Sequence, residues 1–460
     1  MARKKKNDEN DRIRKILESN DSKIHFVGIG GVSMYSLARL SLYFHKKISG
    51  SDRENSHRTD TLKTLGIDVK IGHSEKNITD QDLVVYTHAV AEDNPEIISA
   101  KEKSIPCVSR AEYLGALMTE YDTRIGISGT HGKSTTVAMI DMILSFASKE
   151  HTTLSGAPLV PGEPYKVGRE KDILLYEACE YKDSFLKFHP SLAVALNLEY
   201  DHPDYFRNIS ALRESFTKAL SKAKTVIINN DDENLSLVAS KIKNTSEIIK
   251  VGVRNTCDYS YRITSYQPSG YKFEISDGKE VIGEFELNIP GAYNVTNATM
   301  ATVVALRLGI DVEIIKRALF SYSGISGRME KLGIFENKEV FSDYAHHPTA
   351  IRSSINALKM YTKDSITVVF KPHTYSRTKA LFEDFAKALS LADHVILTEI
   401  YPAREEDNLG ISSESLVSLI GNGAVYCTDF EVKETLSAIN HGVIVLMGAA
   451  GLDIIKKELI

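Results

Sequence analysis

The sequence predicts an α/β protein built from three domains. Its 460 residues are too many for one ordinary hydrophobic core. Short β-branched runs alternate with helical patterns toward both ends of the chain, which is typical of parallel strands joined by crossover helices. Between these regions, a glycine-rich stretch at 129–134 separates an apolar strand pattern from a helical pattern. We therefore expect an α/β unit at each end and a strand–loop–helix unit in the middle.

The first expected domain spans residues 22–121, after a charged tail at 1–21. The tail begins with basic residues, but no apolar stretch follows them, so it lacks the pattern of a secretory signal. The strands of this domain are expected at 24–27, 83–86 and 106–109, and its helices at 34–43 and 95–103.

The second expected domain spans residues 122–328. It opens with the apolar run RIGIS, the glycine-rich GTHGKS and a helical pattern at 134–148. The polar region at 245–289 alternates in a way that predicts antiparallel strands. Further strands are expected at 173–177, 192–197 and 225–229.

The third expected domain spans residues 329–460 and returns to the alternation of strands and helices. This pattern again predicts a parallel sheet with crossover helices. Its strands are expected at 340–342, 366–370, 394–398 and 443–447.

The composition excludes several classes of protein. Apolar residues make up 42% and charged residues 25%, the balance of a soluble globular protein. The 56 basic and 61 acidic residues form no long basic block beyond 3–6, so no nucleic-acid partner is implied. No run of about 18 apolar residues occurs, so we expect no membrane insertion. The four cysteines are widely spaced and suit a reducing compartment, which favours a cytoplasmic protein.

The stretch GTHGKSTT at 129–136 combines the features that a triphosphate needs. Its glycines let backbone N–H groups approach phosphate oxygens, and the helix N-terminus favours negative charge. Lys133 adds a cation, and Ser134 can bind Mg2+. Ile127 stands where the strict phosphate-loop pattern has its first glycine, which leaves a ligand-free glycine turn as the alternative. The flanking strand and helix favour the phosphate loop.

This loop resembles that of the Mur ligase family, which also lacks the first glycine. The segment ACEYKDSFLKFHPSLAVALNLEYDHPDYF at 178–206 is similar to a stretch of the family's central domain. The resemblance implies metal ligands at Ser134, Glu180 and His202, and Mg2+ prefers oxygen ligands such as the first two. Taken alone, Glu180 could instead form a solvated pair with Lys182, and His202 could cap a turn.

Two further segments resemble the family's nucleotide site. GAYNVTNAT at 291–299 corresponds to the stretch that receives adenine, although its asparagines could also cap a helix. SGRMEKLG at 326–333 supplies an arginine whose planar fork suits a transferring phosphoryl group. The ATP contacts implied by the resemblance are Gly129, Thr130, His131, Gly132, Lys133, Ser134, Thr135, Asn294, Asn297, Arg328 and Asp343.

SDYAHHPTA at 342–350 and FKPHTYSRTKAL at 370–381 resemble signatures of the family members that accept UDP-N-acetylmuramate directly. The resemblance implies that Asp343 contacts the nucleotide ribose. Arg377 could hold an α-carboxylate through two parallel hydrogen bonds, or it could be a solvated arginine at a helix start. The residues expected around the incoming amino acid are Tyr344, His346, His373 and Arg377.

HFVGIGGVSMYSLARL at 25–40 and SGSD at 49–52 look at first like a dinucleotide-binding fingerprint. Ser33 replaces the third glycine of that fingerprint, and GxGGxxM followed by SGSD instead resembles the UDP-binding start of the same ligases. Backbone amides would hold the UDP pyrophosphate, and an acidic residue would lie near the uracil or ribose. The implied UDP-sugar contacts are Gly28, Gly30, Gly31 and Asp52.

The resemblance covers roughly residues 22–455. It implies a Rossmann-like N-terminal UDP-binding domain, a central P-loop ATPase-like domain and a Rossmann-like C-terminal domain. It further implies a ligase that uses ATP and Mg2+ to join L-alanine to UDP-N-acetylmuramate through an acyl phosphate, in peptidoglycan precursor synthesis. Small molecules are the expected partners of a monomer or homodimer. The expected catalytic residues are Lys133, Glu180, His202, Arg328 and His346.

Three alternatives remain at this point. A recycling ligase that attaches a preformed peptide to UDP-N-acetylmuramate would carry nearly identical motifs, although GGVSM and YPAREEDNLGISS favour the alanine-adding type. A non-catalytic paralogue that binds the UDP-sugar is disfavoured by the retained charged site residues. A nicotinamide dehydrogenase is disfavoured by the incomplete glycine fingerprint.

Overall fold

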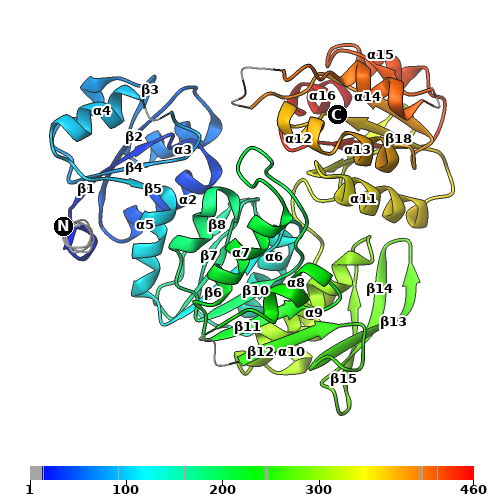
Figure 1. Ribbon diagram of the computed structural model, residues 1–460, viewed down its shortest axis with the longest axis horizontal. Coiled ribbons are helices and arrows are strands. Elements are labelled where there is room, and N and C mark those ends of the chain that lie inside the picture. The colour runs from blue at the N-terminus through cyan, green and yellow to red at the C-terminus, as the bar shows by residue number, and fades with distance from the viewer. Residues whose placement is uncertain are drawn as a thin grey trace. The chain divides into compact units, whose positions relative to one another are not determined.

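The computed structural model describes residues 13, 15–91, 93–159, 162–243, 247–403, 405, 408–421 and 423–460. The basic block at 3–6 and most of the expected charged tail lie outside these residues. The chain forms two compact units, one made of 1–126, 150–193 and 222–224 and the other of 127–149, 194–221 and 225–460. Figure 1 shows the chain coloured along its length. Within the described residues, no helix is both long and apolar enough to span a bilayer.

The N-terminal sheet has five parallel strands in the order β3-β2-β1-β4-β5. This order reverses between β1 and β4, and ligands of such sheets bind at the carboxyl ends of the strands at that point. The loop at 28–31 follows β1 directly. The strands are β1 Lys23–Val27, β2 Lys47–Asp52, β3 Asp68–Ile71, β4 Leu83–Tyr86 and β5 Cys107–Ser109, and the helices are α2 Val32–Tyr43, α3 His57–Thr64, α4 Pro95–Glu102 and α5 Arg110–Leu117.

The parallel α/β arrangement predicted for this region is confirmed, but strand β2 had no strand-like sequence pattern. Its central Gly50 lacks a side chain because a Cβ there would lie 2.7 Å from the Phe26 carbonyl oxygen. Close packing against β1 therefore determines this residue, and it breaks the apolar run that a buried strand usually shows.

The middle sheet has ten strands in the order β15-β14-β13-β12-β11-β10-β6-β9-β7-β8. The prediction of antiparallel strands over 245–289 is correct for β13–β15 and wrong for β12, which pairs in parallel with both β11 and β13. The strands are β6 Thr123–Ser128, β7 Thr152–Leu154, β8 Tyr165–Lys166, β9 Ile173–Glu177, β10 Leu192–Ala195, β11 Thr225–Asn229, β12 Glu247–Gly252, β13 Tyr259–Gln267, β14 Gly270–Ser276 and β15 Val281–Leu287.

Helices α6 and α9 of this region pack against each other and carry the two ends of the expected nucleotide site. Both are rich in small and β-branched side chains, and most residues of each are buried. The described helices are α6 Lys133–Phe146, α7 Ile209–Leu220, α8 Glu233–Ala239, α9 Tyr293–Arg307 and α10 Val312–Phe320, with the 3-10 segment η3 at Tyr181–Lys187.

The C-terminal sheet has six strands in the order β16-β17-β21-β18-β19-β20. The β16–β17 hairpin is antiparallel and the remaining pairs are parallel. The strands are β16 Glu330–Phe335, β17 Lys338–Asp343, β18 Ile366–Phe370, β19 His394–Leu397, β20 Val425–Tyr426 and β21 Val443–Met447.

Two separate apolar clusters cover the two faces of this sheet. Along β21, Val443, Val445 and Met447 belong to one cluster, whereas Ile444 and Leu446 belong to the other. This alternation is expected for a strand buried on both faces. The surrounding helices are α11 Pro348–Tyr361, α12 Tyr375–Ala380, α13 Phe382–Leu389, α14 Ser413–Ile420, α15 Val432–Ser437 and α16 Asp453–Leu459 (Figure 1).

Candidate functional site

The glycine-rich loop joins β6 to α6 in the middle sheet. Gly129 has a φ of 141° and Gly132 a φ of 83°, a region that favours glycine. A Cβ on Gly129 would lie 3.1 Å from Leu196 Cβ, and one on Gly132 would lie 2.8 Å from Asn297 Oδ1. The loop is therefore held against the end of β10 and the start of α9, in the tight turn that presents backbone amides to a phosphate.

Lys133 and Ser134 form the first turn of α6. The ammonium group of Lys133 donates to the carbonyl oxygens of Gly129 and of Thr130, the latter at 3.4 Å, so it folds back across the loop. Ser134 and Thr135 are buried. The start of this 14-residue helix thus combines a cation, two hydroxyl groups and the positive end of the helix dipole.

Asn197, which the sequence analysis missed, fixes His131 in the loop. Its Oδ1 accepts a hydrogen bond from the His131 N–H at 2.8 Å, and its Nδ2 donates to the His131 carbonyl at 3.0 Å. Thr130 Oγ1 also accepts from the Glu199 N–H at 2.9 Å. Asn197 comes two residues after β10, and a polar residue at a carboxyl strand end beside the loop was the available signal.

The three expected metal ligands belong to different parts of the chain. Glu180 lies in the first compact unit, whereas Ser134 and His202 lie in the second. Glu180 is only 1% exposed, which excludes a solvated pair with Lys182. His202 has a positive φ of 56°, which is uncommon outside glycine and frequent at functional sites. The metal site that the sequence predicts for these three residues therefore stays a prediction.

Asn294 and Asn297 lie buried at the start of α9. Asn297 Nδ2 donates to Asn294 Oδ1 at 3.2 Å, and Asn294 Nδ2 donates to the Pro290 carbonyl at 2.7 Å. The N-cap position is Ala292, and no side chain caps this helix. Helix capping therefore does not account for the two asparagines.

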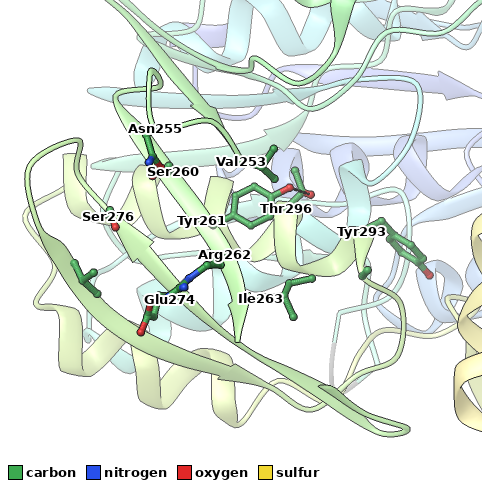
Figure 2. A pocket seen from close by; sticks show the side chains of 12 residues that line it. Val253, Asn255, Ser260, Tyr261, Arg262, Ile263, Glu274, Ser276, Tyr293 and Thr296 are labelled. Atoms are coloured by element: carbon green, nitrogen blue, oxygen red, sulfur yellow. Dashed lines mark hydrogen bonds and ion pairs between the residues drawn. The ribbon is translucent and has the colours of Figure 1, made fainter. Parts of the chain in front are cut away.

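A cavity of about 780 Å3 opens beside this helix start, along β13 and β14 (Figure 2). Its wall includes the ion pair between Arg262 and Glu274, whose Nη2 and Oε2 atoms lie 2.7 Å apart. Tyr261 and Thr296 also line it, and their hydroxyl oxygens lie 2.8 Å apart. Ala292, Tyr293 and Thr296 of the expected adenine segment line the cavity, but the two asparagines do not.

Arg328, Asp343 and Tyr344 come together where the chain enters the C-terminal sheet. The Arg328 guanidinium carbon lies 4.3 Å from the centre of the Tyr344 ring, within cation–π range. Asp343 is buried at the end of β17 and accepts a hydrogen bond from Ser354 Oγ. Burial raises the pKa of Asp343 because it penalises the charged carboxylate.

Arg377 and His373 lie together in a cluster that also contains Asp201, another residue outside the expected site. Arg377 Nε donates to Asp201 Oδ1 at 2.7 Å, and its Nη1 lies 3.0 Å from His373 Nδ1. Arg377 is 4% exposed and Asp201 is 3% exposed. A solvated arginine at a helix start is therefore the wrong interpretation of Arg377.

The charge of Arg377 affects the protonation of Asp201 and of nearby His346. Burial alone would raise the pKa of Asp201, but the charge of Arg377 outweighs that penalty and holds the pKa well below its usual range. His346 lies near the same cluster, its ring centre 6.1 Å from that of His373. Burial and the Arg377 charge hold the pKa of His346 well below its usual range, so its imidazole is neutral at pH 7.

The expected UDP contacts lie together in the first compact unit. Gly28 has a φ of 83° directly after β1, and Gly31 is the N-cap residue of α2. Asp52, at the end of β2, accepts a hydrogen bond from the Gly30 N–H at 2.8 Å. The Asp52 carboxylate therefore already accepts a hydrogen bond from one of the amides that the family resemblance assigns to the UDP pyrophosphate.

Sequence models of one family match most of the chain. The Mur ligase family catalytic domain matches residues 23–122, the Mur ligase middle domain matches 127–305, and the Mur ligase glutamate ligase domain matches 327–451. The predicted three-domain α/β fold is thereby confirmed.

Curated relatives support the same family. A UDP-N-acetylmuramate--L-alanine ligase from Caldicellulosiruptor bescii is 39% identical over 455 residues, covering 95% of this chain and 99% of the relative. The enzyme of the same name from Clostridium acetobutylicum is 40% identical over 443 residues, covering 94% of this chain and 96% of the relative.

Solved structures agree in fold. The crystal structure of a UDP-N-acetylmuramate-alanine ligase from Thermotoga maritima matches with a TM-score of 0.80 and 28% identity, covering 95% of this chain and 98% of that one. A murein peptide ligase from Psychrobacter arcticus matches with a TM-score of 0.73 at 23% identity, which shows the shared fold alone. With curated relatives near 40% identity over almost its whole length, the chain belongs to the Mur ligase family.

Proposed function

We propose that the protein is an ATP-dependent ligase that joins L-alanine to UDP-N-acetylmuramate during peptidoglycan precursor synthesis in the cytoplasm. The relatives named for this activity support it. The structural observation that carries it is the contact between Asp201 and Arg377. Asp201 immediately precedes the proposed metal ligand His202, so the contact supports a role for Arg377 close to one of the proposed metal ligands, as a ligation reaction requires.

In this proposal, each of the three domains binds one substrate. Residues 22–121 bind the UDP-sugar through the backbone at Gly28, Gly30 and Gly31 and through Asp52. Residues 122–328 bind ATP, and residues 329–460 bind the amino acid. The protein would act on small molecules, as a monomer or homodimer.

The first step activates the muramoyl carboxylate. A carboxylate oxygen attacks the γ-phosphorus of ATP, and the bond from this phosphorus to the β-γ bridging oxygen breaks. ADP departs, and the muramoyl group becomes an acyl phosphate. Lys133 and Arg328 stabilise the negative charge on the transferring group, since catalysis of phosphoryl transfer rests on position and charge. Ser134, Glu180 and His202 would hold Mg2+, which would supply further charge neutralisation.

The second step forms the amide. The amino group of alanine attacks the acyl carbon, and phosphate leaves with the electrons of the broken C–O bond. Arg377 and His373, with Tyr344, hold the amino acid near this carbon. His346 takes the amine proton, because its neutral imidazole is available as an acceptor at pH 7.

The deciding experiment incubates the protein with ATP, Mg2+ and UDP-N-acetylmuramate, adding L-alanine, glycine, L-serine or a preformed peptide in separate reactions. Mass spectrometry of the nucleotide product then identifies what was attached. A product that gains one alanyl residue supports the proposal. A product formed only with the peptide would instead identify a recycling ligase, and UDP-sugar binding without ATP turnover would identify a non-catalytic paralogue.

A further inference from the structure

Three side chains of metal-ligand type meet beside the phosphate loop, apart from the proposed Mg2+ ligands. His131 lies in the loop, Glu199 follows β10, and His347 is the N-cap residue of α11. All three belong to the second compact unit. One ligand atom from each lies within 4.8 Å of the other two. The reaction proposed above gives no role to Glu199 or His347.

The distances in this cluster suit a single small cation. Glu199 Oε2 lies 3.1 Å from His131 Nε2 and 3.3 Å from His347 Nδ1. Two ligands bound to one tetrahedral Zn2+ at about 2.0–2.1 Å lie about 3.3 Å from each other. The distances from Glu199 to His131 and to His347 therefore match the distance between two ligands of a tetrahedral Zn2+ site.

The hydrogen bond behind His347 determines which of its nitrogens faces the cluster. His347 Nε2 lies 3.2 Å from the Tyr200 carbonyl oxygen, which can only accept, so Nε2 carries the proton. The lone pair of Nδ1 then faces the Glu199 carboxylate oxygen, which is also an acceptor. The Thr349 N–H reaches Nδ1 only at 3.4 Å. A carbonyl behind the distal nitrogen is the usual way to orient a metal-binding histidine.

The protonation states of the cluster also match metal binding. Burial and the neighbouring His131 lower the pKa of His347 to about 4, so its imidazole is neutral at pH 7. Burial alone would raise the pKa of Glu199, but the hydrogen bond and charge of His131 outweigh it and lower the pKa. A neutral imidazole and an ionised carboxylate are the forms that bind a metal ion.

We propose that His131, Glu199 and His347 bind one divalent transition-metal ion of the Zn2+ type. Two imidazoles and one carboxylate favour such an ion over Mg2+, which prefers oxygen ligands. Three protein ligands leave a fourth tetrahedral position open to water or to a substrate oxygen. Because His131 lies in the phosphate loop and His347 begins the first helix of the C-terminal sheet, the bound ion cross-links these two parts of the second unit. This proposal of a metal site does not depend on the proposed ligase reaction.

The test uses the full-length protein, stripped of metal and free of nucleotide. Co2+ is added as a spectroscopic probe for a tetrahedral Zn2+ site, and its visible absorption is recorded during the titration. One equivalent of Co2+ should produce the strong visible bands of a tetrahedral complex. Zn2+ should abolish these bands, whereas a large excess of Mg2+ should leave them unchanged.

Substitutions assign the signal to the three residues. His131→Gln, Glu199→Gln and His347→Asn should each weaken Co2+ binding by about tenfold or more. Asparagine is chosen at 347 because it keeps a side-chain cap for α11. The matched control is His202→Asn, which alters the proposed Mg2+ site and should retain the Co2+ bands. Circular dichroism checks that each variant is folded, and Zn2+ should raise the Tm of the wild type but not of the three variants.

The absence of Co2+ bands in the wild type would overturn the proposal. So would equal Co2+ affinity in all folded variants, which would identify the cluster as a hydrogen-bonded contact only. Loss of the bands in His202→Asn alone would assign them to the proposed Mg2+ site instead. None of these measurements depends on ligase activity, so a failure of the proposed function leaves this test intact.

Discussion

Asp201 and Arg377, 176 positions apart in the chain, form an ion pair in which Arg377 Nε lies 2.7 Å from Asp201 Oδ1. Both side chains are almost completely buried. A buried pair of this kind is costly to disrupt, because removing one partner leaves the other charge without compensation. The residue proposed to hold the amino acid is therefore itself held in place by a residue beside the proposed metal site.

Arg377→Lys should reduce kcat/KM for alanine about tenfold to over a hundredfold. An ammonium group can keep the attraction to Asp201 but lacks the fork that would hold an α-carboxylate, and losing one charged hydrogen bond costs about 1.5–3 kcal/mol. Steady-state kinetics with alanine varied and the other substrates saturating measures the effect. The affinities for ATP and the UDP-sugar should stay within about threefold. Unchanged use of alanine together with a collapse of ATP binding would assign Arg377 to the nucleotide site.

Asp201→Asn should destabilise the protein at pH 7 by about 3–5 kcal/mol, because the buried guanidinium of Arg377 loses its counter-charge. The pKa of Asp201 is lower in the folded protein than in the unfolded chain, where it is about 3.9. Its stabilising contribution is therefore complete above about pH 4–5 and is lost as the pH falls toward the folded-state pKa.

Urea unfolding of the wild type and of Asp201→Asn at several pH values measures this difference. The gap between their free energies of unfolding should be constant from about pH 6 to 8 and should shrink below about pH 4. A gap that stays constant down to the acid transition would contradict the assigned pKa shift.

Lys133→Ala should abolish ligation and leave binding of the UDP-sugar nearly intact. The lysine lies at the start of α6 beside the phosphate loop, whereas the proposed UDP contacts belong to the first compact unit. Phosphate release in the presence of all substrates and calorimetric titration of UDP-N-acetylmuramate measure the two properties. Phosphate release above about a tenth of the wild-type rate would contradict a role for Lys133 in transfer.

Glu180→Ala should raise the concentration of Mg2+ needed for half-maximal activity. The carboxylate is almost fully buried, and its loss removes an oxygen ligand of the kind that Mg2+ prefers. The Mg2+ dependence of phosphate release is compared with that of Glu177→Ala, which alters a half-buried carboxylate three positions earlier. The same Mg2+ dependence in both variants would count against Glu180 as a ligand.

The sequence predicted the fold where strands are uniformly apolar and missed it where packing imposed other residues. The central residues of β1, β11 and β18 are buried and mostly apolar, and the sequence pattern identified these three strands directly. Strand β2 was missed because Gly50 must approach the β1 backbone closely. The direction of β12 could not be predicted, since the alternation of side chains is the same in parallel and antiparallel strands.

The candidate site was predictable only within continuous motifs. Gly129, Gly132 and Lys133 stand together in one loop, and their chemistry could be inferred from spacing. Asn197 acts on that loop from a separate strand end, and its position at a carboxyl strand end does not indicate which residue it contacts. The same holds for Asp201, whose partner is far away in the sequence. Contacts across such separations depend on tertiary packing rather than on periodicity.

The absence of a side chain at Gly132 has a consequence for the proposed nucleotide site. Because Gly132 has no Cβ, Asn297 Oδ1 can lie close to the loop, where a Cβ would come within 2.8 Å of it. If Asn297 contacts the base and the loop contacts the phosphates, both contacts depend on the length of the linker between base and phosphate. An analogue with a longer or shorter linker would then satisfy only one contact at a time. The proposed site would therefore select a nucleotide by the distance between base and phosphate as well as by its chemical groups.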